Sequence, residues 1–361
     1  MRILHTESSC GWGGQEIRVL DEAQGMSMRG HEVAIVAPRE ARIYEAALKR
    51  GLSVEALAIG RKALGGFLQM RRRLKADPVD VINTHSSTDS WLAALACATL
   101  ARAPAIVRTR HVSASISNNL STRWLYRRAT RHIVTTGEGL RMQLVRENGL
   151  PPERITSIPT GIDAARFVPG AKETARRLTG LTPGRRLIGI VATLRSWKGH
   201  RHLIEAVRRL PDDIGLVIVG DGPQRRNIES QIREGGISDR VWLVGNQDDV
   251  LPWLQSLDVF VLPSYANEGV PQALVQAMLC GLPCVTTAAG SIGEIARDDD
   301  TAIIVRAEDP ADLQRGLERA LGGAELCKRL GTTAREYCAA NLSVEVMLDR
   351  MERVFRHVAH E

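Results

Sequence analysis

The amino-acid sequence predicts an α/β protein with two doubly wound domains, each a parallel sheet covered by helices on both faces. Three observations support this prediction. Short apolar runs alternate with longer segments of helical periodicity, as in parallel sheets. The same alternation begins again after a stretch rich in proline and glycine. The 361 residues are too many for one ordinary domain and enough for two separate cores.

The first half of the chain contains the first series of strands. The predicted strands are the apolar runs 2–6, 32–37, 80–84, 105–109 and 132–136. The segments between them have the apolar spacing of helices. Because ligands of doubly wound domains bind outside the carboxyl ends of the strands, we expect functional residues in the loops that follow strands.

The second half of the chain contains a second series. Its predicted strands are residues 187–193, 215–220, 241–245, 259–263, 283–287 and 302–305. Proline and glycine punctuate residues 158–163 and 168–170, which is typical of a linker. We therefore predict an N-terminal domain over 1–165 and a C-terminal domain over 166–342. The remaining segment, 343–361, has the pattern of a helix.

Composition limits where the protein is expected to act. Hydrophobic residues make up 44% of the chain, and no apolar run approaches the length of about 18 residues that a membrane span requires. The first residues lack the apolar core of a secretory signal, which indicates a cytoplasmic protein. The cysteines are scattered, so we expect reduced thiols and no zinc site. The acidic run 298–300 is expected to be a solvated turn, so no metal is predicted.

The net charge of +7 comes from the N-terminal half, where residues 1–165 carry 23 Lys and Arg against 15 Asp and Glu. Two basic segments, 71–73 and 123–128, suit an anionic acceptor or anionic lipid headgroups. Arginine runs are also typical of a solvated helix face. The sequence has no helix-turn-helix, zinc-finger or aromatic RNA-binding signature, so nucleic acid is not expected as a partner. Contact with the inner face of the cytoplasmic membrane is the hypothesis that follows.

Glycines follow the first predicted strand. The sequence Gly-Trp-Gly-Gly-Gln-Glu at 11–16 opens a helix, so Gly13 and Gly14 let backbone N–H groups approach an anion at the positively polarised helix start. The third glycine of a dinucleotide-binding fingerprint is missing, which makes a nicotinamide enzyme a poor fit. A tight strand-to-helix turn without a ligand is the alternative.

Two cations follow the first strand of the second series. In the sequence Thr-Leu-Arg-Ser-Trp-Lys-Gly at 193–199, Arg195 and Lys198 lie three residues apart near a helix start. Two such cations suit a departing diphosphate, whose negative charge they would stabilise. A pair of surface charges is the alternative.

A strand–loop–helix junction at 263–278 offers polar groups of another kind. Glu268 lies in the loop, where its carboxylate suits sugar hydroxyls. Gln276 lies about two turns into the helix and suits a ribose diol. The remaining candidate donor contacts of this junction are Gly269, Val270 and Gln272. An exposed loop carboxylate and a polar helix face are the alternatives for Glu268 and Gln276.

Polar residues also follow strands of the first series. His111 comes after the strand 105–109, and a histidine there is either a structural residue or a ligand contact. His85 follows the strand 80–84, with Asp89 nearby. These two residues are predicted to contact an acceptor or to cap the next helix.

This combination of motifs resembles the retaining glycosyltransferases of family 4, and the resemblance extends over most of the chain. The segments that carry it, in order, are Gly13-Gly14, the Arg-Thr-Arg-His stretch that ends at His111, residues 159–163, Lys198-Gly199, residues 219–223, and the region from Glu268 to Pro283. The resemblance implies the GT-B architecture, with two Rossmann-like domains and an interdomain cleft. The first domain would bind the acceptor and the second the nucleotide sugar, and the C-terminal helix would cross back to the first domain.

The resemblance also implies roles for single residues. Gly13 and Gly14 would line the donor phosphates, and His111 would approach the transferred sugar. Lys198 would bind the diphosphate, and Glu268 would hold sugar hydroxyls. No metal or other cofactor is expected beside the nucleotide sugar.

Two positions depart from the family pattern. Gln276 stands where the family usually has a glutamate, so the ribose would be bound by a neutral group. Thr193 stands where the family commonly has a phosphate-binding arginine, and we expect Arg195 to substitute for it.

The predicted reaction transfers a sugar from a nucleotide diphosphate to an acceptor hydroxyl with retention at the anomeric carbon. A lipid-linked, lipopolysaccharide or polysaccharide intermediate is the expected acceptor. Two alternatives stay open. A sugar-nucleotide epimerase of the same architecture would convert the donor without an acceptor. A non-catalytic module would bind the sugar nucleotide without turnover, and Gln276 keeps this alternative open.

Overall fold

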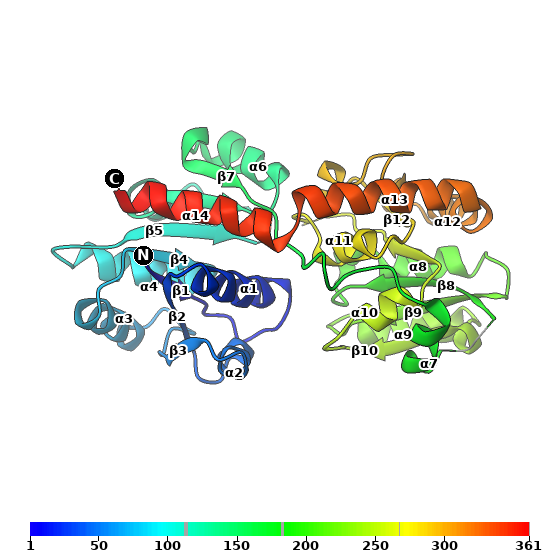
Figure 1. The fold of residues 1–361 in the computed structure, drawn as a ribbon, viewed down its shortest axis with the longest axis horizontal. Coiled ribbons are helices and arrows are strands. Elements are labelled where there is room, and N and C mark those ends of the chain that lie inside the picture. The colour runs from blue at the N-terminus through cyan, green and yellow to red at the C-terminus, as the bar shows by residue number, and fades with distance from the viewer. Residues whose placement is uncertain (112–114, 182–183, 267, 361) are drawn as a thin grey trace. The chain divides into compact units, whose positions relative to one another are not determined.

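The computed structural model of the protein describes residues 1–111, 115–181, 184–266 and 268–360, and the chain forms two compact units (Figure 1). Unit 1 consists of Met1–Gly161 and Val344–Glu361, and unit 2 of Ile162–Ser343. The division thus lies between residues 161 and 162, whereas the sequence placed it between 165 and 166. Ile162 belongs to unit 2 because its N–H donates to the carbonyl oxygen of Leu342, 2.9 Å away.

Unit 1 is a doubly wound parallel domain. Its described residues form a seven-stranded sheet in the order β3-β2-β1-β4-β5-β6-β7, and all neighbouring strands are parallel. The strands are β1 (Arg2–Thr6), β2 (Glu32–Ala37), β3 (Ser53–Ala56), β4 (Val81–Thr84), β5 (Ala105–Arg110), β6 (His132–Thr135) and β7 (Ile155–Ser157). The helices are α1 (Gly14–Met28), α2 (Arg42–Lys49), α3 (Leu64–Ala76), α4 (Ser87–Ala98), α5 (Leu120–Trp124), the π-helical turn η1 (Leu125–Ala129), α6 (Glu138–Asn148), the 3-10 turn η2 (Pro152–Arg154) and α14 (Val344–His360). The strand order reverses between β1 and β4, which is where ligands of such domains bind.

Both faces of the unit 1 sheet are buried, which explains why its strands are continuous apolar runs. On one face, Leu4 and Ile82 pack in a core shared with α3 and α4. On the other face, Ile3 and Val81 pack with Phe355 of α14. Alternation along each strand therefore supplies two cores from adjacent residues.

The last helix, α14, is part of unit 1 although it is far from the rest of that unit in sequence. Figure 1 shows it along the unit 1 sheet, close to α1. A Cβ on Gly25 of α1 would lie 2.3 Å from Cδ1 of Leu348, so α1 and α14 approach closely because residue 25 has no side chain. Nη2 of Arg350 also donates to the carbonyl oxygen of Ser157 over 2.5 Å.

Unit 2 is a second doubly wound parallel domain. Its described residues form a six-stranded sheet in the order β10-β9-β8-β11-β12-β13. The strands are β8 (Arg186–Val191), β9 (Ile214–Val219), β10 (Val241–Gly245), β11 (Val259–Leu262), β12 (Cys284–Thr286) and β13 (Ile303–Ile304). The helices and 3-10 turns are α7 (Lys172–Thr179), η3 (Ser196–Lys198), α8 (His200–Val207), α9 (Arg225–Glu234), η4 (Ser238–Arg240), α10 (Leu251–Gln255), α11 (Gln272–Leu279), η5 (Ile292–Glu294), α12 (Pro310–Gly322) and α13 (Ala324–Asn341). The predicted α/β class, with two doubly wound parallel sheets, is confirmed.

Two strands are additions to the predicted set. β3 and β7 lie at opposite edges of the unit 1 sheet and are short. The residues of β3 are exposed or half-buried, so they do not form the apolar run by which a central strand is identified. Edge strands of this kind are covered on fewer sides and therefore carry a weaker sequence signal.

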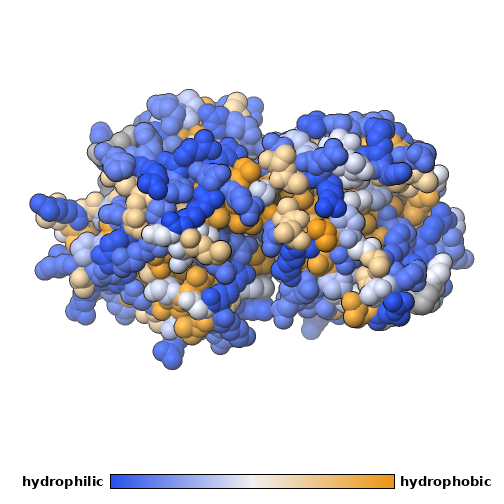
Figure 2. Space-filling view, in the orientation of Figure 1, coloured by the Kyte–Doolittle hydropathy of each residue, from blue (hydrophilic) through white to orange (hydrophobic). Residues whose placement is uncertain are grey.

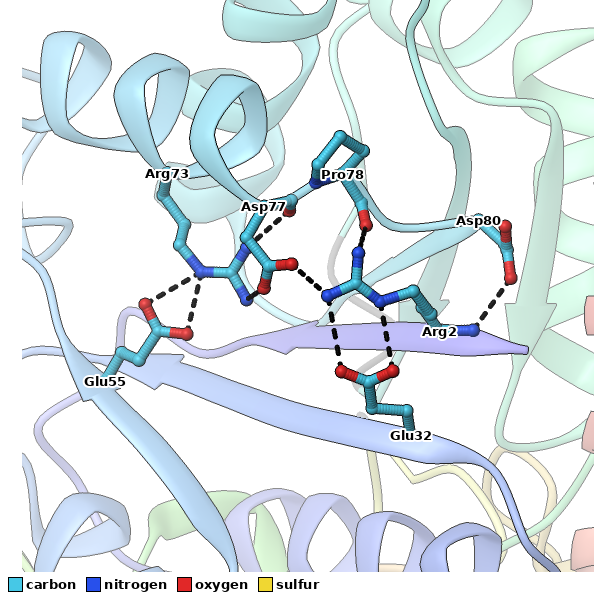
Figure 3. Close-up of polar contacts among 7 residues, drawn as sticks. All are labelled: Arg2, Glu32, Glu55, Arg73, Asp77, Pro78 and Asp80. Atoms are coloured by element: carbon cyan, nitrogen blue, oxygen red, sulfur yellow. Dashed lines mark hydrogen bonds and ion pairs between the residues drawn. The ribbon is translucent and has the colours of Figure 1, made fainter.

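Charged side chains at the amino ends of β1 and β2 and at the end of α3 are paired with one another and with Glu55 of β3 (Figure 3). The guanidinium of Arg2 contacts the carboxylates of Glu32, at 3.1 Å, and of Asp77. Arg73 of α3 lies 2.7 Å from Glu55 of β3 and 2.9 Å from Asp77. These residues, the amino-edge network, link β1, β2, β3 and α3.

The rest of the surface is largely hydrophilic on the face shown in Figure 2. None of the described helices combines the length and the apolar character needed to cross a lipid bilayer. The cysteines within the described residues are all free thiols.

Candidate functional site

Three histidines form a chain at the carboxyl edge of the unit 1 sheet. They come from three neighbouring strands, with His5 in β1, His85 directly after β4 and His111 directly after β5. Nδ1 of His5 lies 3.1 Å from Nε2 of His85, and Nδ1 of His85 lies 3.0 Å from Nε2 of His111. The structure thus brings together the predicted residues His85 and His111 and adds His5. We call these residues the histidine chain.

The histidine chain is held in its neutral form. Burial, together with the nearby Arg18, lowers the pKa of His5 to about 3. Burial and the neighbouring His111 lower the pKa of His85 well below its usual value. Burial and Arg18 have the same effect on the pKa of His111. A neutral imidazole has one donor and one acceptor nitrogen, so the chain has a direction.

That direction follows from the buried end of the chain. Among the described residues, Nε2 of His5 has no hydrogen-bond partner. A buried N–H without a partner is rarer than a buried acceptor without one, so the proton of His5 is assigned to Nδ1. His5 then donates to His85, and His85 donates to His111. Nδ1 of His111 is left as the donor at the open end of the chain.

Asp89 is predicted to contact the acceptor or to cap a helix, and its geometry favours the cap. The side chain has no exposed surface. Its oxygens accept from the N–H groups of His85 and Ser86, over 2.9 and 3.0 Å, and from the hydroxyl of Thr6 over 2.8 Å. Ser86 and Asp89 together form a capping box at the start of α4. Asp89 thus fixes the loop that carries His85, as the predicted cap would.

A pocket of about 590 Å³ opens beside the histidine chain, entirely within unit 1. It lies where the carboxyl ends of β4 and β5 meet the start of α4 and the π-helical turn η1. Its lining residues include His85, Ser87, Trp91, Arg108, His111 and Tyr126. We call it the unit 1 pocket.

Gly13, after β1, leaves open space at the start of α1. Gly13 is the N-cap of this helix and Gly14 its first residue. A Cβ on Gly13 would meet only the carboxylate of Glu16, at 3.9 Å. Packing within the protein therefore does not require a glycine here. Contact between these glycines and donor phosphates stays a prediction.

In unit 2, Lys198 and Glu268 form an ion pair at the carboxyl edge of the sheet. Lys198 ends the turn η3 that follows β8, and Glu268 lies in the loop between β11 and α11. Nζ of Lys198 lies 2.6 Å from Oε1 of Glu268, with 17% and 6% of the side chains exposed. A charge-assisted hydrogen bond of this length holds both groups in place. The structure thus joins two predicted catalytic residues that are far apart in sequence.

Two glycines let the loops around this ion pair come together. Gly199 has a φ of +75°, and a Cβ there would lie 2.0 Å from the carbonyl oxygen of Pro263. Gly290 has a φ of +58°, and a Cβ there would lie 2.3 Å from the carbonyl oxygen of Glu268. Left-handed backbone and contacts this close admit only glycine. The backbone is therefore fixed on both sides of the ion pair.

Arg195 lies outside the ion pair. Its side chain is exposed, and its guanidinium carbon lies 5.6 Å from the centre of the Trp197 ring. This stacking is a cation–π contact that orients the side chain. The structure leaves Arg195 accessible to a ligand.

The other predicted donor contacts surround the start of α11. Gly269 is half-buried and Val270 buried, directly after Glu268. Gln272 is the first residue of α11. Gln272 and Gln276 are half-buried and four residues apart, which places them on one face of the helix.

Several polar residues of the unit 1 carboxyl edge were missed by the sequence analysis. Burial and the nearby Asp89 raise the pKa of Glu7 to about 8. Arg108 and Arg110 were noted only as part of the stretch that ends at His111, and Tyr126 only as part of a basic segment. All are buried. Two arginines at alternate positions of an otherwise apolar strand were the available signal, because charged residues are seldom buried without a reason.

Two family models match the chain in consecutive segments. One, described as Glycosyltransferase Family 4, matches residues 12–166, and the other, described as Glycosyl transferases group 1, matches residues 171–337. The chain is 29% identical over 282 residues to a 2-deoxystreptamine glucosyltransferase of Streptomyces kanamyceticus, which covers 72% of each chain. It is 28% identical over 243 residues to an Escherichia coli UDP-Gal:alpha-D-GlcNAc-diphosphoundecaprenol alpha-1,3-galactosyltransferase, covering 63% of this chain and 62% of that one.

Solved structures share the fold over nearly the whole chain. The Anabaena protein HepE in complex with UDP-glucose superposes with a TM-score of 0.89 at 18% identity, covering 99% of this chain and 100% of that one. WaaG, a glycosyltransferase involved in lipopolysaccharide biosynthesis, superposes with a TM-score of 0.73 at 18% identity, covering 99% of both chains. Likeness at this level of identity shows a common fold.

Proposed function

Since this chain belongs to glycosyltransferase family 4 and has the GT-B fold, we propose that it transfers a sugar from a nucleotide diphosphate to an acceptor hydroxyl with retention at the anomeric carbon. The observation that carries this proposal is the Lys198–Glu268 ion pair at the carboxyl edge of the unit 2 sheet. It places a fixed cation and a fixed carboxylate where a doubly wound domain binds its ligand.

The cation would act on the leaving group. When the bond between the anomeric carbon and the diphosphate breaks, negative charge grows on the phosphate oxygens. Lys198, held in position by Glu268, would stabilise that charge without having to reorganise during the reaction. Arg195, which is exposed, would supply a second charge. The carboxylate of Glu268 would accept hydrogen bonds from hydroxyls of the transferred sugar.

The histidine chain would act on the sugar from unit 1. With Nδ1 of His111 as its donor, the chain presents an N–H to a hydroxyl oxygen of the transferred sugar. His5 and His85 would be positioning residues, because they fix the tautomer and the ring orientation of His111. A protonated His111 would repel the positive charge that develops at the anomeric carbon as the diphosphate leaves, so the neutral form is the useful one.

Retention places the acceptor on the face from which the diphosphate leaves. The acceptor oxygen forms the new bond to the anomeric carbon as the bond to the diphosphate breaks. An oxygen of the departing phosphate takes the proton of the acceptor hydroxyl. No side-chain nucleophile is needed in this scheme, and we expect activity to be unchanged in EDTA because no metal is proposed to take part.

The acceptor is proposed to be a lipid-linked or lipopolysaccharide intermediate. This proposal is supported by the names of its relatives, which act on a diphosphoundecaprenol-linked sugar in one case and in lipopolysaccharide biosynthesis in another. Contact with an anionic membrane through unit 1 is part of the same proposal. The basic segments offer limited support, because Arg73 is already paired with Glu55 and Arg127 donates to the carbonyl of Gly149.

The test is turnover of nucleotide sugars with product analysis. UDP-glucose is the first donor to try, since HepE binds it with the same fold. Each donor is incubated with a panel of lipid-linked and soluble acceptors, and the anomeric configuration of the product is read by proton NMR. A product with the configuration of the donor is expected. Conversion of the donor without an acceptor would indicate an epimerase, and binding without turnover on any acceptor would indicate a non-catalytic module.

A further inference from the structure

Arg108 is a buried cation whose hydrogen-bonding capacity is only partly used within the described residues. Its side chain comes from β5, and the residue is 5% exposed. Among the described residues, Nε and Nη1 of Arg108 have no hydrogen-bond partner. Its guanidinium carbon stands 4.8 Å from the centre of the Tyr126 ring, a cation–π contact that leaves Nε and Nη1 without a hydrogen-bond acceptor. Burying a charged group in this state is costly unless something completes it.

Among the described residues, nearby acidic groups do not accept hydrogen bonds from the unpartnered nitrogens of Arg108. Asp89 attracts Arg108, but the oxygens of Asp89 accept hydrogen bonds from Thr6, His85 and Ser86. None of the described residues that line the unit 1 pocket is acidic. Three of them are cationic, namely Lys62, Arg108 and Arg110.

Another buried arginine of the protein, Arg240, has its guanidinium hydrogen bonds satisfied. Arg240 of unit 2 is 3% exposed. Its Nη1 donates to the carbonyl oxygens of Leu210, Pro211 and Ile214, at 2.8–3.2 Å. Backbone carbonyl groups therefore satisfy the guanidinium of Arg240, as expected for a buried arginine with a structural role. Arg108 differs because Nε and Nη1 have no such acceptor among the described residues, and the residue lines a pocket.

The pocket is also built to hold a hydroxylated molecule. Its described lining includes Ser86, Ser87 and Thr122, whose side chains carry hydroxyls. Trp91 lines it as well and stacks on Trp124 with a distance of 6.1 Å between ring centres. Hydroxyls exchange hydrogen bonds with a polyol, and an aromatic face covers its C–H groups.

We propose that the unit 1 pocket binds the phosphate group of the acceptor, with Arg108 as a direct ligand, so that the acceptor is a phosphorylated carbohydrate or polyol. This inference rests on the proposed glycosyl transfer and names the acceptor class. A phosphate ester carries about −1.5 to −2 charges and matches the planar fork of a guanidinium. A carboxylate carries one charge and would offset less of the positive charge of the three pocket cations.

Binding of sorbitol 6-phosphate, measured by calorimetry against uncharged sorbitol, tests the proposal. The wild type and Lys198→Ala are expected to bind the phosphate and not sorbitol. Arg108→Gln is expected to bind it about 10- to 100-fold more weakly, because charge-assisted hydrogen bonds are lost. Unchanged binding in Arg108→Gln, or equally tight binding of glucuronate, would overturn the assignment.

A vesicle arm distinguishes a lipid-borne phosphate from a soluble one. Phosphatidylcholine vesicles with and without phosphatidic acid are sedimented with the wild type and with Arg108→Gln. Phosphatidic-acid-dependent sedimentation that Arg108→Gln abolishes, without binding of sorbitol 6-phosphate, supports the pocket with a lipid-linked acceptor. Failure of the wild type to bind either phosphate overturns the proposal. Donor binding and its loss in Lys198→Ala remain separate readouts of the proposed function.

Two further variants keep the test decisive if Arg108→Gln folds poorly. Ser87 is exposed at the first turn of α4, where a carboxylate is favourable, so Ser87→Asp is expected to fold and to block the phosphate by pairing with the pocket cations. Unchanged phosphate binding in Ser87→Asp would contradict the proposal. Arg108→Met is expected to leave Tm unchanged or raise it, whereas Arg240→Met lowers it. An equal loss of Tm in both would make Arg108 a structural residue.

Discussion

The two edges of the unit 1 sheet differ in whether their charged side chains have partners. At the amino edge, Arg2 and Arg73 each contact two carboxylates, and the pairs connect neighbouring strands with α3 (Figure 3). At the carboxyl edge, Arg108 has guanidinium nitrogens without a partner among the described residues, and the histidine chain is buried in its neutral form.

This difference separates stability from function within one sheet. Charges that satisfy one another contribute modestly to stability and need nothing from outside. Buried polar groups that are left incomplete cost stability, and they persist where a ligand completes them. In unit 2 the carboxyl edge holds Lys198 and Glu268, which are paired but lie beside loops that glycines bring close together. Substitutions at the two kinds of edge should therefore differ in what they change.

The largest effect is expected from Lys198→Ala. Loss of a fixed cation at the leaving group should lower kcat by about 100- to 1,000-fold, as the loss of one preorganised electrostatic contact does in other enzymes. The matched control is Lys172→Ala, which removes another lysine paired with a carboxylate of unit 2, Asp258. Steady-state kinetics with Lys172→Ala should give a kcat near that of the wild type. Equal losses in both variants would contradict a special role for Lys198.

A smaller effect is expected from His111→Ala. Loss of one hydrogen bond to the transferred sugar should lower kcat/KM by about 10- to 100-fold. His132, at the amino end of β6 in the same sheet, bonds to the hydroxyl of Thr156 and supplies the control His132→Ala. That control should lose stability and keep its activity. Equal losses of activity in both histidine variants would contradict the claim that only the carboxyl edge serves the reaction.

The histidine chain should also make stability depend on pH. The folded protein keeps His5 neutral down to about pH 3, whereas an unfolded chain protonates it near pH 6.5, so the unfolded state binds more protons between these values. The free energy of unfolding should therefore fall as pH decreases through this window, by at most about 1.4 kcal/mol per pH unit for each such histidine. Glu7, with its pKa raised to about 8, acts in the opposite direction between about pH 4.5 and 8.

Comparison with His5→Asn isolates the contribution of this histidine. Urea unfolding between pH 4 and 6.5, a range of about 2.5 pH units inside the window above, should show a flatter dependence in His5→Asn than in the wild type. The contribution of Glu7 is common to both proteins. The same slope in both would mean that His5 is protonated in the folded state.

The smallest effect is expected at the amino edge. Arg73→Met should lower the free energy of unfolding by about 0.5–1 kcal/mol, because the ion pairs that it removes are partly exposed. Its kcat and KM should equal those of the wild type. A clear loss of activity in this variant, at a temperature where it is fully folded, would show that the amino edge is not purely structural.

The sequence was sufficient for the fold and for one half of the site. Central strands are apolar on both faces, so their runs were readable, whereas β3 lacks that pattern. Lys198 and Glu268 were identified from loops after strands and from the family resemblance. Their contact depends on the close approach at Gly199 and Gly290, which spacing along the chain does not reveal.

The unit 1 edge was harder to predict, because its chemistry depends on burial. Asp89 and Ser86 form a capping box, a local pattern that the sequence offered as an alternative. Arg108 could not be singled out from the sequence, because its burial and its missing hydrogen-bond partners are visible only in the structure. His5 lies inside a strand and was not distinguished from the strand's buried residues.

A thermal-shift comparison tests the central claim most directly. The wild type, Lys198→Ala and Arg73→Met are melted with UDP, GDP, ADP and CMP and their common sugar conjugates, with NAD as a control, because a ligand that binds only the folded state raises Tm. We predict that one nucleoside diphosphate and its sugar conjugate raise the Tm of the wild type and of Arg73→Met, and that Lys198→Ala loses most of this shift. No shift with any nucleotide, or a full shift in Lys198→Ala, would contradict the account.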